Sequence, residues 1–187
     1  YMPLRFWFNR NPGLALPLIA LQYHEVKIIA EWADSNTAKL CTDLLVNYVY
    51  LDTDERRRFA QVSHEYLIEQ VQHTGVESVA KDATSKTITL TYNHPVKALF
   101  WKGWVSHTDA DKDVGYNAKL QLNGHDRFSE QDSLYFTGVQ PYECGLRHPL
   151  SGGTVATGAT ATGMYSFCLK PGEHQPSGSC NFSRIDN

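Results

Sequence analysis

The chain has 187 residues, of which 42% are hydrophobic and 12% aromatic, and this is enough to form one core of ordinary size or parts of two. Its formal net charge of −3 and pI near 6.2 leave no basic excess to neutralise a phosphate backbone, so we expect no direct binding to nucleic acid. No apolar run reaches the length of about 18 residues that a membrane span needs, and no signal peptide is recognisable, so we expect neither membrane insertion nor export.

Alternation of apolar and polar residues predicts β-strands along most of the chain. In the stretch 24–32, Val26 and Ile28 fall on one face while Glu25 and Lys27 fall on the other. The stretch 86–93 repeats this pattern with its threonines facing outward. Together with β-branched and aromatic runs, the pattern predicts strands at 4–8, 24–32, 44–51, 65–73, 86–93, 96–101, 118–122, 164–169 and 180–185.

One segment, 54–62, has the signals of a short helix. Asp52 or Thr53 can cap it, acidic residues occupy its first turn, and arginines follow toward its carbonyl end, so the charges complement the helix dipole. We expect Phe59 to pack into the junction between the two strand-rich stretches that this helix connects. Because the helix separates two strand-rich stretches, it also predicts the boundary between two domains.

Three stretches are typical of loops. Residues 107–115 are polar and acidic, and residues 150–163 are rich in glycine and threonine, so both are expected at the surface. Prolines and glycines between 170 and 180 predict a turn whose role is to direct the strand 180–185. Many short strands, long loops and a single helix indicate an all-β antiparallel sandwich or jelly roll.

The histidines do not form a recognisable metal motif. His24 and His64 are each followed by glutamate, as in a zinc-protease helix, but isoleucine stands where the second histidine is needed four residues later. Four further histidines lie in predicted loops at irregular spacing: His107, His125, His148 and His174. We therefore expect no shared metal site.

The acidic loop resembles the start of a calcium-binding loop without completing it. Asp109, Asp111 and Asp113 alternate as calcium ligands do, but Gly115 comes one place late and Leu120 replaces the closing glutamate. The sequence also lacks a nucleophile elbow, a P-loop and a dinucleotide-binding fingerprint. The expectation is a protein that is not an enzyme, with no catalytic residues, no cofactor-binding residues and no metal ligands.

Three further features are interpreted as structural. The run Arg56–Arg58 favours a solvated face or a set of interdomain salt bridges over a phosphate site. Asn181 begins a formal glycosylation sequon, which we expect to stay unmodified because it lies in a predicted strand and no signal peptide precedes it. No two cysteines form a CxxC pair, so we expect them to be reduced and mostly buried. They are Cys41, Cys144, Cys168 and Cys180.

Six blocks of the sequence, in order, resemble the major capsid proteins of the nucleocytoplasmic large DNA viruses, a family that includes those of algal viruses and of iridoviruses. They include "LDTDERRRFAQVSHEYLIEQVQ" and "YSFCLKPGEHQPSGSCNFSRIDN", and they span 11–28, 51–72, 93–101, 119–128, 139–142 and 165–187. The resemblance implies a double jelly roll, two tandem antiparallel β-sandwiches, present here in part. It implies that residues 1–53 close the first roll, 54–64 form the connecting helix, and 65–187 open the second.

The resemblance also implies a structural role without catalytic residues or cofactors. Three copies of such a protein form a pseudo-hexagonal capsomer, a homotrimer, and capsomers tile an icosahedral shell. The expected partners are therefore further copies of the same protein and minor capsid proteins. The expected location is the virion, after assembly in the host cytoplasm.

A carbohydrate-binding β-sandwich of the lectin type is the alternative function. Jelly rolls are common among lectins, and exposed aromatic rings can stack on sugars. Trp101, Trp104 and Tyr116 flank the acidic loop and would form its site. A metal-dependent enzyme on a jelly roll is the third possibility, and the absence of a tight histidine and glutamate motif speaks against it.

Overall fold

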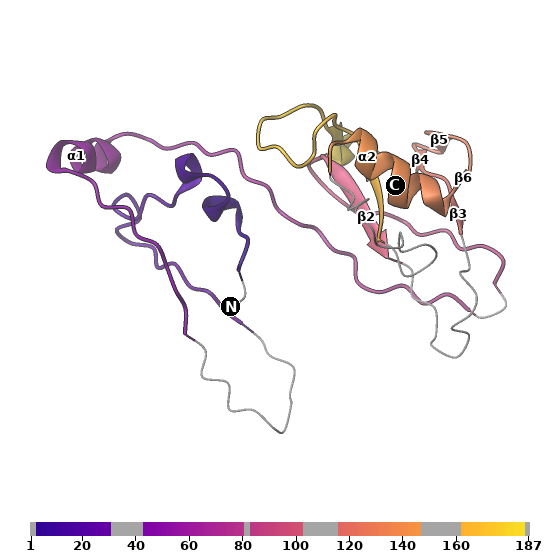
Figure 1. Cartoon of the computed structure of the whole chain (residues 1–187), viewed down its shortest axis with the longest axis horizontal. Helices are drawn as coiled ribbons and strands as arrows, with labels where there is room; N and C mark the ends of the chain where they lie inside the picture. The colour runs from indigo at the N-terminus through magenta and orange to yellow at the C-terminus, as the bar shows by residue number, and fades with distance from the viewer. Residues whose placement is uncertain (1–2, 31–42, 81–82, 103–115, 147–161, 186–187) are drawn as a thin grey trace, which may run out of the picture. The chain divides into compact units, whose positions relative to one another are not determined.

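The computed structural model describes residues 3–30, 43–80, 83–102, 116–146 and 162–185. It contains two compact units, Tyr1–Val71 and Gln72–Asn187, each of which is described by itself (Figure 1). Within the described residues, the first unit contains short helices and extended chain, whereas all the assigned strands belong to the second unit.

The first unit contains two 3-10 turns, η1 (Trp7–Asn9) and η2 (Pro12–Leu14), and the helix α1 (Thr53–Gln61). The Asp52 carboxylate caps α1 by accepting a hydrogen bond from the Glu55 backbone amide at 2.9 Å. The prediction of a helix here is confirmed, with its start one residue earlier than expected.

Long-range polar contacts hold the N-terminal segment of this unit against the chain that follows α1. Arg10 forms an ion pair with Glu69 at 2.9 Å. The Tyr66 hydroxyl donates to the Ala15 carbonyl at 3.4 Å, and the rings of Tyr66 and Trp7 lie 6.1 Å apart. Among the described residues of this unit only Leu14 is a buried hydrophobic residue, so these contacts supplement a small core.

The second unit is organised around the antiparallel pair β2 (Ala98–Lys102) and β7 (Thr162–Ser166). The register runs from Ala98 opposite Ser166 to Lys102 opposite Thr162. The other antiparallel pairs in the described residues are β1 (Pro95–Val96) with β8 (Cys180–Asn181), β3 (Asn117–Ala118) with β6 (Gln131–Asp132), and β4 (Gln121–Leu122) with β5 (His125–Asp126). Asn123 and Gly124 join β4 to β5 with φ of 53° and 75°, the left-handed turn that an Asn-Gly pair favours.

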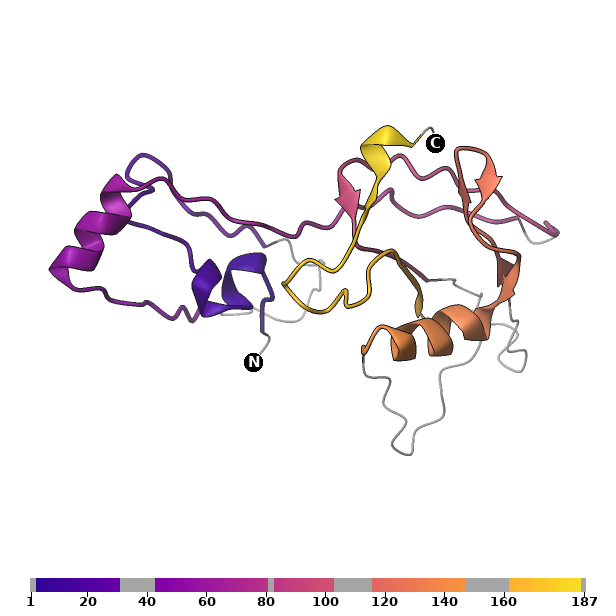
Figure 2. The same cartoon turned by 90° about the horizontal axis from the view of Figure 1, so that it is seen from above.

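A helical segment covers the β2–β7 pair. It consists of the π-helical turn η3 (Tyr135–Val139), which runs directly into α2 (Gln140–Glu143) (Figure 2). Pro141 lies where the π-helical turn passes into α2, and because proline lacks a backbone N–H it donates no helical hydrogen bond there. Phe136 is fully buried and packs edge-on against Trp101 with ring centroids 5.1 Å apart. The remaining buried hydrophobic residues described in this unit are Cys144, Met164, Tyr165, Cys168 and Phe182.

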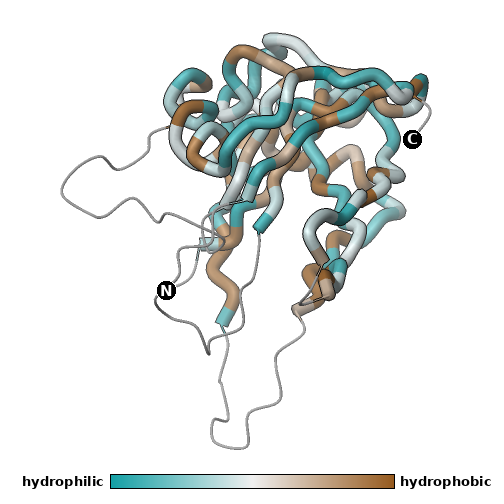
Figure 3. Tube along the Cα trace, turned by 90° about the vertical axis from the view of Figure 1, so that its right-hand side faces the viewer, coloured by the Kyte–Doolittle hydropathy of each residue, from teal (hydrophilic) through white to brown (hydrophobic). Residues whose placement is uncertain are grey.

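Several predicted strands are not strands in this structure. The stretch 4–8 leads into η1, and the described parts of 24–32, 44–51, 65–73 and 86–93 form no ladder. Hydrophobic and hydrophilic residues are interleaved along the described chain (Figure 3). Alternation favours an extended backbone, but a strand also needs a neighbouring backbone to pair with. The first requirement is met by the sequence, while the second is not met within the described residues.

Other strand predictions are confirmed or corrected in their bounds. The stretch 96–101 corresponds to β1 and β2, and 164–169 to β7. The stretch 118–122 divides into β3 and β4, and 180–185 becomes β8 followed by the 3-10 turn η4 (Phe182–Arg184). The predicted loop 107–115 lies outside the described residues, as do residues 150–161 of the other loop, whose last two residues belong to β7.

The turn between β7 and β8 has the directing role that was expected of it. The Lys170 amide donates to the Ser177 hydroxyl at 3.0 Å, and the Leu169 amide donates to the Ser177 carbonyl at 3.4 Å. Gly178 has a φ of 131°, and a Cβ there would lie 3.1 Å from the Phe167 carbonyl oxygen. Only glycine fits this position without strain, and the turn returns the chain to pair with β1.

Substitution of Gly163 tests the packing of the β2–β7 pair. A Cβ at Gly163 would lie 2.6 Å from the Tyr116 hydroxyl and 2.7 Å from the Trp101 ring. We expect Gly163→Ala to lower the free energy of unfolding by about 1 to 3 kcal/mol, measured by urea denaturation. Gly138→Ala is the control, because nothing lies within 4 Å of a Cβ there. Equal losses in both variants would contradict the packing explanation.

Candidate functional site

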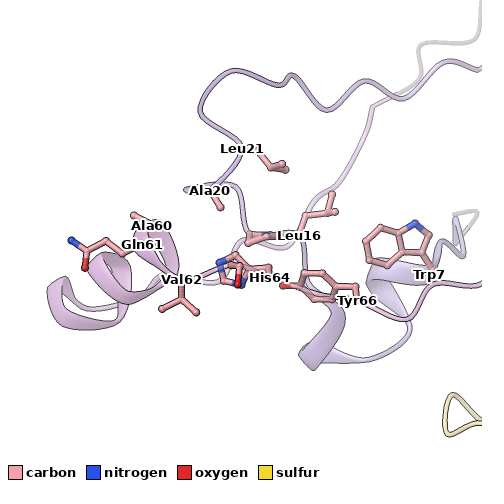
Figure 4. A pocket seen from close by; sticks show the side chains of 11 residues that line it. Trp7, Leu16, Ala20, Leu21, Ala60, Gln61, Val62, His64 and Tyr66 are labelled. Carbon is pink, nitrogen blue, oxygen red and sulfur yellow. The ribbon is translucent and has the colours of Figure 1, made fainter.

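A groove of about 690 Å³ lies beside the C-terminal end of α1 within the first unit (Figure 4). We call it the α1 groove. The N-terminal segment contributes Trp7, Leu16, Pro17, Ala20 and Leu21 to its wall, and the chain from the end of α1 contributes Ala60, Gln61, Val62, Ser63, His64 and Tyr66. Its lining is mainly apolar, so it offers a surface for packing and no constellation for catalysis.

His64 fixes the way the chain leaves α1. The last carbonyls of a helix have no partner within the helix. The Val62 amide donates to the Arg58 carbonyl at 3.0 Å, and the His64 Nε2 lies 2.8 Å from the Phe59 carbonyl oxygen. The His64 ring also stacks on Phe59, with centroids 5.3 Å apart, and Tyr66 follows at 6.4 Å. Phe59 therefore packs on the residues just after its own helix.

The arginines of α1 point to solvent. Arg56, Arg57 and Arg58 are all exposed, and α1 has no buried residue. Arg57 lies 3.9 Å from Asp54 of the same helix, with side chains that are 73% and 93% exposed, so this pair contributes little to stability. This exposure agrees with a solvated face, and the preference for a structural role over a phosphate site stays a prediction. Arg56 and Arg57 line a second groove, of about 230 Å³, with Ile19, Thr53 and Ala60.

In the second unit, residues 72–80 run beside residues 83–93 (Figure 2), and side-chain hydrogen bonds connect the two stretches. The Gln72 side chain donates through Nε2 to the Asn93 backbone carbonyl at 3.0 Å. Its Oε1 accepts from the Asn93 backbone N–H at 2.9 Å. Farther along, Lys86 pairs with Glu77 at 2.8 Å. These contacts have the order of an antiparallel hairpin, and the Gln72 side chain takes the place that a backbone peptide group has in a ladder.

We call the contact between Gln72 and Asn93 the Gln72 clamp. His94, the next residue, has a left-handed backbone conformation with a φ of 70°. Its amide donates to the Ser183 hydroxyl at 2.7 Å, and its carbonyl accepts from the Phe182 amide at 3.1 Å. Asn181 in turn accepts from the Ser183 amide at 3.1 Å. The sequon residues thus serve as fold contacts, with Phe182 only 2% exposed. That Asn181 stays unmodified remains a prediction.

Two of the aromatic residues considered for sugar binding contact each other. The Trp101 indole N–H donates to the Tyr116 hydroxyl at 2.8 Å, and both side chains are partly buried. Burial raises the pKa of Tyr116, the Trp101 hydrogen bond lowers it, and the nearby Asp132 carboxylate raises it. Trp101 also packs on the buried Phe136, so this pair takes part in the internal packing of the second unit. Trp104 lies outside the described residues.

The candidate metal ligands are scattered wherever the structure describes them. His24 and His125 are exposed, and His174 is partly buried in the turn before β8. Within the described ranges, no group of three histidine, cysteine, aspartate or glutamate side chains could hold a metal ion. His107, His148, Asp109, Asp111 and Asp113 fall outside those ranges. The expectation of a metal-free protein therefore stays a prediction.

The cysteines and the helices offer no further site. Cys144 and Cys168 are buried free thiols and Cys180 is a partly buried one, whereas Cys41 lies outside the described residues. Burial raises the pKa of Cys180 and Arg127 lowers it, with burial the larger effect. Of the helices that the structure describes, none has the length and apolar character to cross a bilayer.

Comparison with known proteins identifies the family. A model of the large eukaryotic DNA virus major capsid protein matches residues 55–117 and 105–187, and a model of the major capsid protein N-terminus matches residues 1–52. The chain belongs to this family of viral major capsid proteins. Together the two models account for nearly all of the chain.

Individual relatives agree with this assignment. The chain is 54% identical over 210 residues to the major capsid protein of Pyramimonas orientalis virus and 42% identical over 238 residues to that of Paramecium bursaria Chlorella virus 1. All of this chain is covered in both cases, against 52% of each relative. A quasi-atomic structure of the PBCV-1 virus capsid matches the whole chain with a TM-score of 0.72 and 36% identity, over 55% of that structure's chain. The chain thus spans about half the length of these capsid proteins.

The relatives carry names of capsid proteins and not of enzymes, in agreement with the absence of catalytic motifs in the sequence. The sequence patterns did not predict two contacts between distant segments, Gln72 with Asn93 and His94 with Ser183. A single glutamine or serine carries no signal for a partner 21 or 89 residues away. The family blocks 51–72, 93–101 and 165–187 contain these residues, which is the one sequence signal that marks them.

Phe59 and Arg57 provide a comparison of packing with charge on α1. Phe59 is partly buried against His64, whereas Arg57 is exposed. In the full-length capsid protein, we expect Phe59→Ala to lower the free energy of unfolding by about 1 to 2 kcal/mol, and Arg57→Ala to change it by less than about 0.5 kcal/mol. Urea denaturation measures both. A larger loss from Arg57→Ala would show that charge and not packing holds the helix in place.

The Gln72 clamp is tested by an isosteric change. Gln72→Glu removes the donor to the Asn93 carbonyl and places a negative charge beside that oxygen. We expect a loss of about 0.5 to 1.5 kcal/mol in unfolding free energy at neutral pH, with recovery as the introduced carboxylate is protonated below about pH 5. Gln70→Glu, at an exposed neighbouring position, is the control. A loss that is equal in both variants or independent of pH would contradict the clamp.

Proposed function

We propose that this chain is part of a major capsid protein that folds as a double jelly roll, forms trimeric pseudo-hexagonal capsomers and builds the icosahedral shell of a large DNA virus. The observation that carries the proposal is the match of the whole chain to the PBCV-1 capsid structure, with a TM-score of 0.72 at 36% identity. The family models, which together span residues 1–52 and 55–187, support it.

We propose the division of the chain given by the resemblance, with residues 1–53 in the first roll, 54–64 as connecting helix and 65–187 in the second roll. The two family models support it, since one ends at residue 52 and the other begins at residue 55, next to the start of α1. Within this structure α1 belongs to the first compact unit, which extends to Val71.

The extended segments without a ladder fit this proposal. They expose many large hydrophobic residues, as a strand does before its neighbours in a sandwich are in place. Examples are Leu45, Tyr48, Val49 and Tyr50 in the stretch 44–51, and Val71, Val76 and Val79 near the hairpin. The relatives are about twice as long as this chain, so each has further polypeptide from which pairing strands can come.

The partners follow from the same role. Capsid assembly requires contacts between copies of the protein, and the proposed partners are these copies and minor capsid proteins. The proposed location is the virion, with assembly in the host cytoplasm. Direct contact with nucleic acid and insertion into a membrane are not part of the proposal.

Expression of the full-length protein beside the isolated residues 1–187 tests this function. We expect the full-length protein to sediment as a trimer and to show a pseudo-hexagonal outline by electron microscopy. The isolated chain should aggregate or melt without cooperativity, because unpaired edges and apolar segments stay uncovered. A full-length protein that remains monomeric, or an isolated chain that is a monodisperse, cooperatively melting monomer, would contradict the proposal.

A further inference from the structure

The turn between β4 and β5 joins an asparagine directly to a glycine (Figure 1). Asn123 and Gly124 have φ of 53° and 75°, and both residues are exposed. Nothing lies within 4 Å of a Cβ placed at Gly124, and the Asn-Gly dipeptide occurs once in the sequence. The turn therefore presents an asparagine amide next to an unhindered backbone nitrogen, with water on all sides.

These two groups can react with each other. The Gly124 backbone nitrogen forms a bond to Cγ of Asn123, the bond from Cγ to Nδ2 breaks, and Nδ2 leaves as ammonia with the proton of the Gly124 N–H. Water then opens the five-membered succinimide ring at either of its two carbonyl groups. One opening gives aspartate and the other isoaspartate, and nothing is oxidised or reduced. Glycine favours ring closure because it has no Cβ to hinder the approach.

We propose that Asn123 is a site of spontaneous deamidation whose rate is set by the opening of the β4–β5 hairpin. Ring closure requires the peptide between Asn123 and Gly124 to rotate until its nitrogen faces Cγ. In a closed two-residue turn, the paired strands on both sides fix the orientation of this peptide. The reaction therefore proceeds from the opened hairpin, and local opening of so small an element has a low free energy.

Few contacts keep the hairpin closed. Each strand has two residues, with Gln121 opposite Asp126 at the end away from the turn. The Gln121 side-chain amide donates to the Asp126 carboxylate at 2.6 Å, and the Lys119 ammonium group lies 3.4 Å from the same oxygen. Beyond them, the Arg127 amide donates to the Leu120 carbonyl at 2.8 Å. Asp126 thus joins the two strands through its side chain, and its removal should make opening easier.

The products fit the turn less well than asparagine does. Either product adds one negative charge at the tip of the hairpin. Isoaspartate also adds a methylene group to the main chain, so the two-residue turn no longer matches the pairing of Leu122 with His125. Deamidation should therefore loosen the hairpin further, and this inference does not depend on the assembly proposed above.

The test follows the full-length protein during incubation at neutral pH and physiological temperature. Trypsin releases residues 120–127 as one peptide, because Lys119 and Arg127 bound it. Mass spectrometry measures replacement of the amide by a carboxyl group, and isoaspartyl methyltransferase labelling distinguishes isoaspartate from aspartate. A synthetic peptide of residues 120–127 gives the rate without a hairpin, and Asn117, which is followed by alanine, is the internal control.

Three variants test the role of the hairpin. Asp126→Ala and Gln121→Ala each remove one side of the same side-chain contact. Glu130→Ala is the matched control, because it removes the same charge at an exposed position outside the hairpin. The rate of each variant is divided by that of a synthetic peptide with the same sequence, and thermal melting measures folding.

We expect Asn123 to deamidate about three- to tenfold more slowly in the folded protein than in the peptide, with isoaspartate in excess. Asp126→Ala and Gln121→Ala should raise the relative rate about two- to fivefold, and Glu130→Ala should leave it unchanged. An amide that persists after the peptide has reacted fully, aspartate as the sole product, or equal reaction at Asn117 would overturn the modification site. A rate equal to that of the peptide, or one that neither loosening variant raises above the control, would overturn its dependence on hairpin opening.

Discussion

The pairing of β2 with β7 is the interaction on which the second unit depends. It brings Trp101 opposite Gly163, and because glycine has no side chain, the indole ring can lie across β7. Phe136 then packs edge-on against that ring, and the helical segment that carries Phe136 covers the sheet. Tyr116 is drawn in by its hydrogen bond to the indole N–H. One ladder thus determines where a helix and an otherwise distant tyrosine are placed.

Side chains perform the corresponding task where no ladder exists. Gln72 pairs with both backbone groups of Asn93, Ser183 accepts from the His94 amide, and His64 bonds to the end of α1. Each contact satisfies a backbone group that would otherwise depend on water. Such contacts connect few atoms and bury little apolar surface, so these segments are held in place without forming a core of their own. They remain open to pairing with further strands.

How far the sequence predicted this structure depends on how local the cause is. The helix α1 was predicted because its cap, acidic first turn and arginines all lie within ten residues, and the turn before β8 was predicted from its prolines and glycines. The stretches 44–51 and 86–93 were predicted as strands and are not strands here, since pairing depends on a distant backbone that alternation does not report. The groove beside α1 could not be predicted at all, because its walls come from segments more than thirty residues apart.

The helix α1 combines a local attachment with an exposed, charged surface in the described residues. A helix that faced its own core on every side could not contact a neighbour, while one held by nothing could not be positioned. Among the described residues, contacts between Phe59 and His64 connect α1 to the chain that follows it, and the arginines of α1 are exposed. Exposed ion pairs contribute little to the stability of a single chain. The same charges cost little to maintain at the surface, because water keeps the guanidinium groups hydrated and no desolvation has to be offset. Three consecutive arginines on a nine-residue helix are therefore compatible with a fold that is held by Phe59 and His64, to which their charges contribute little.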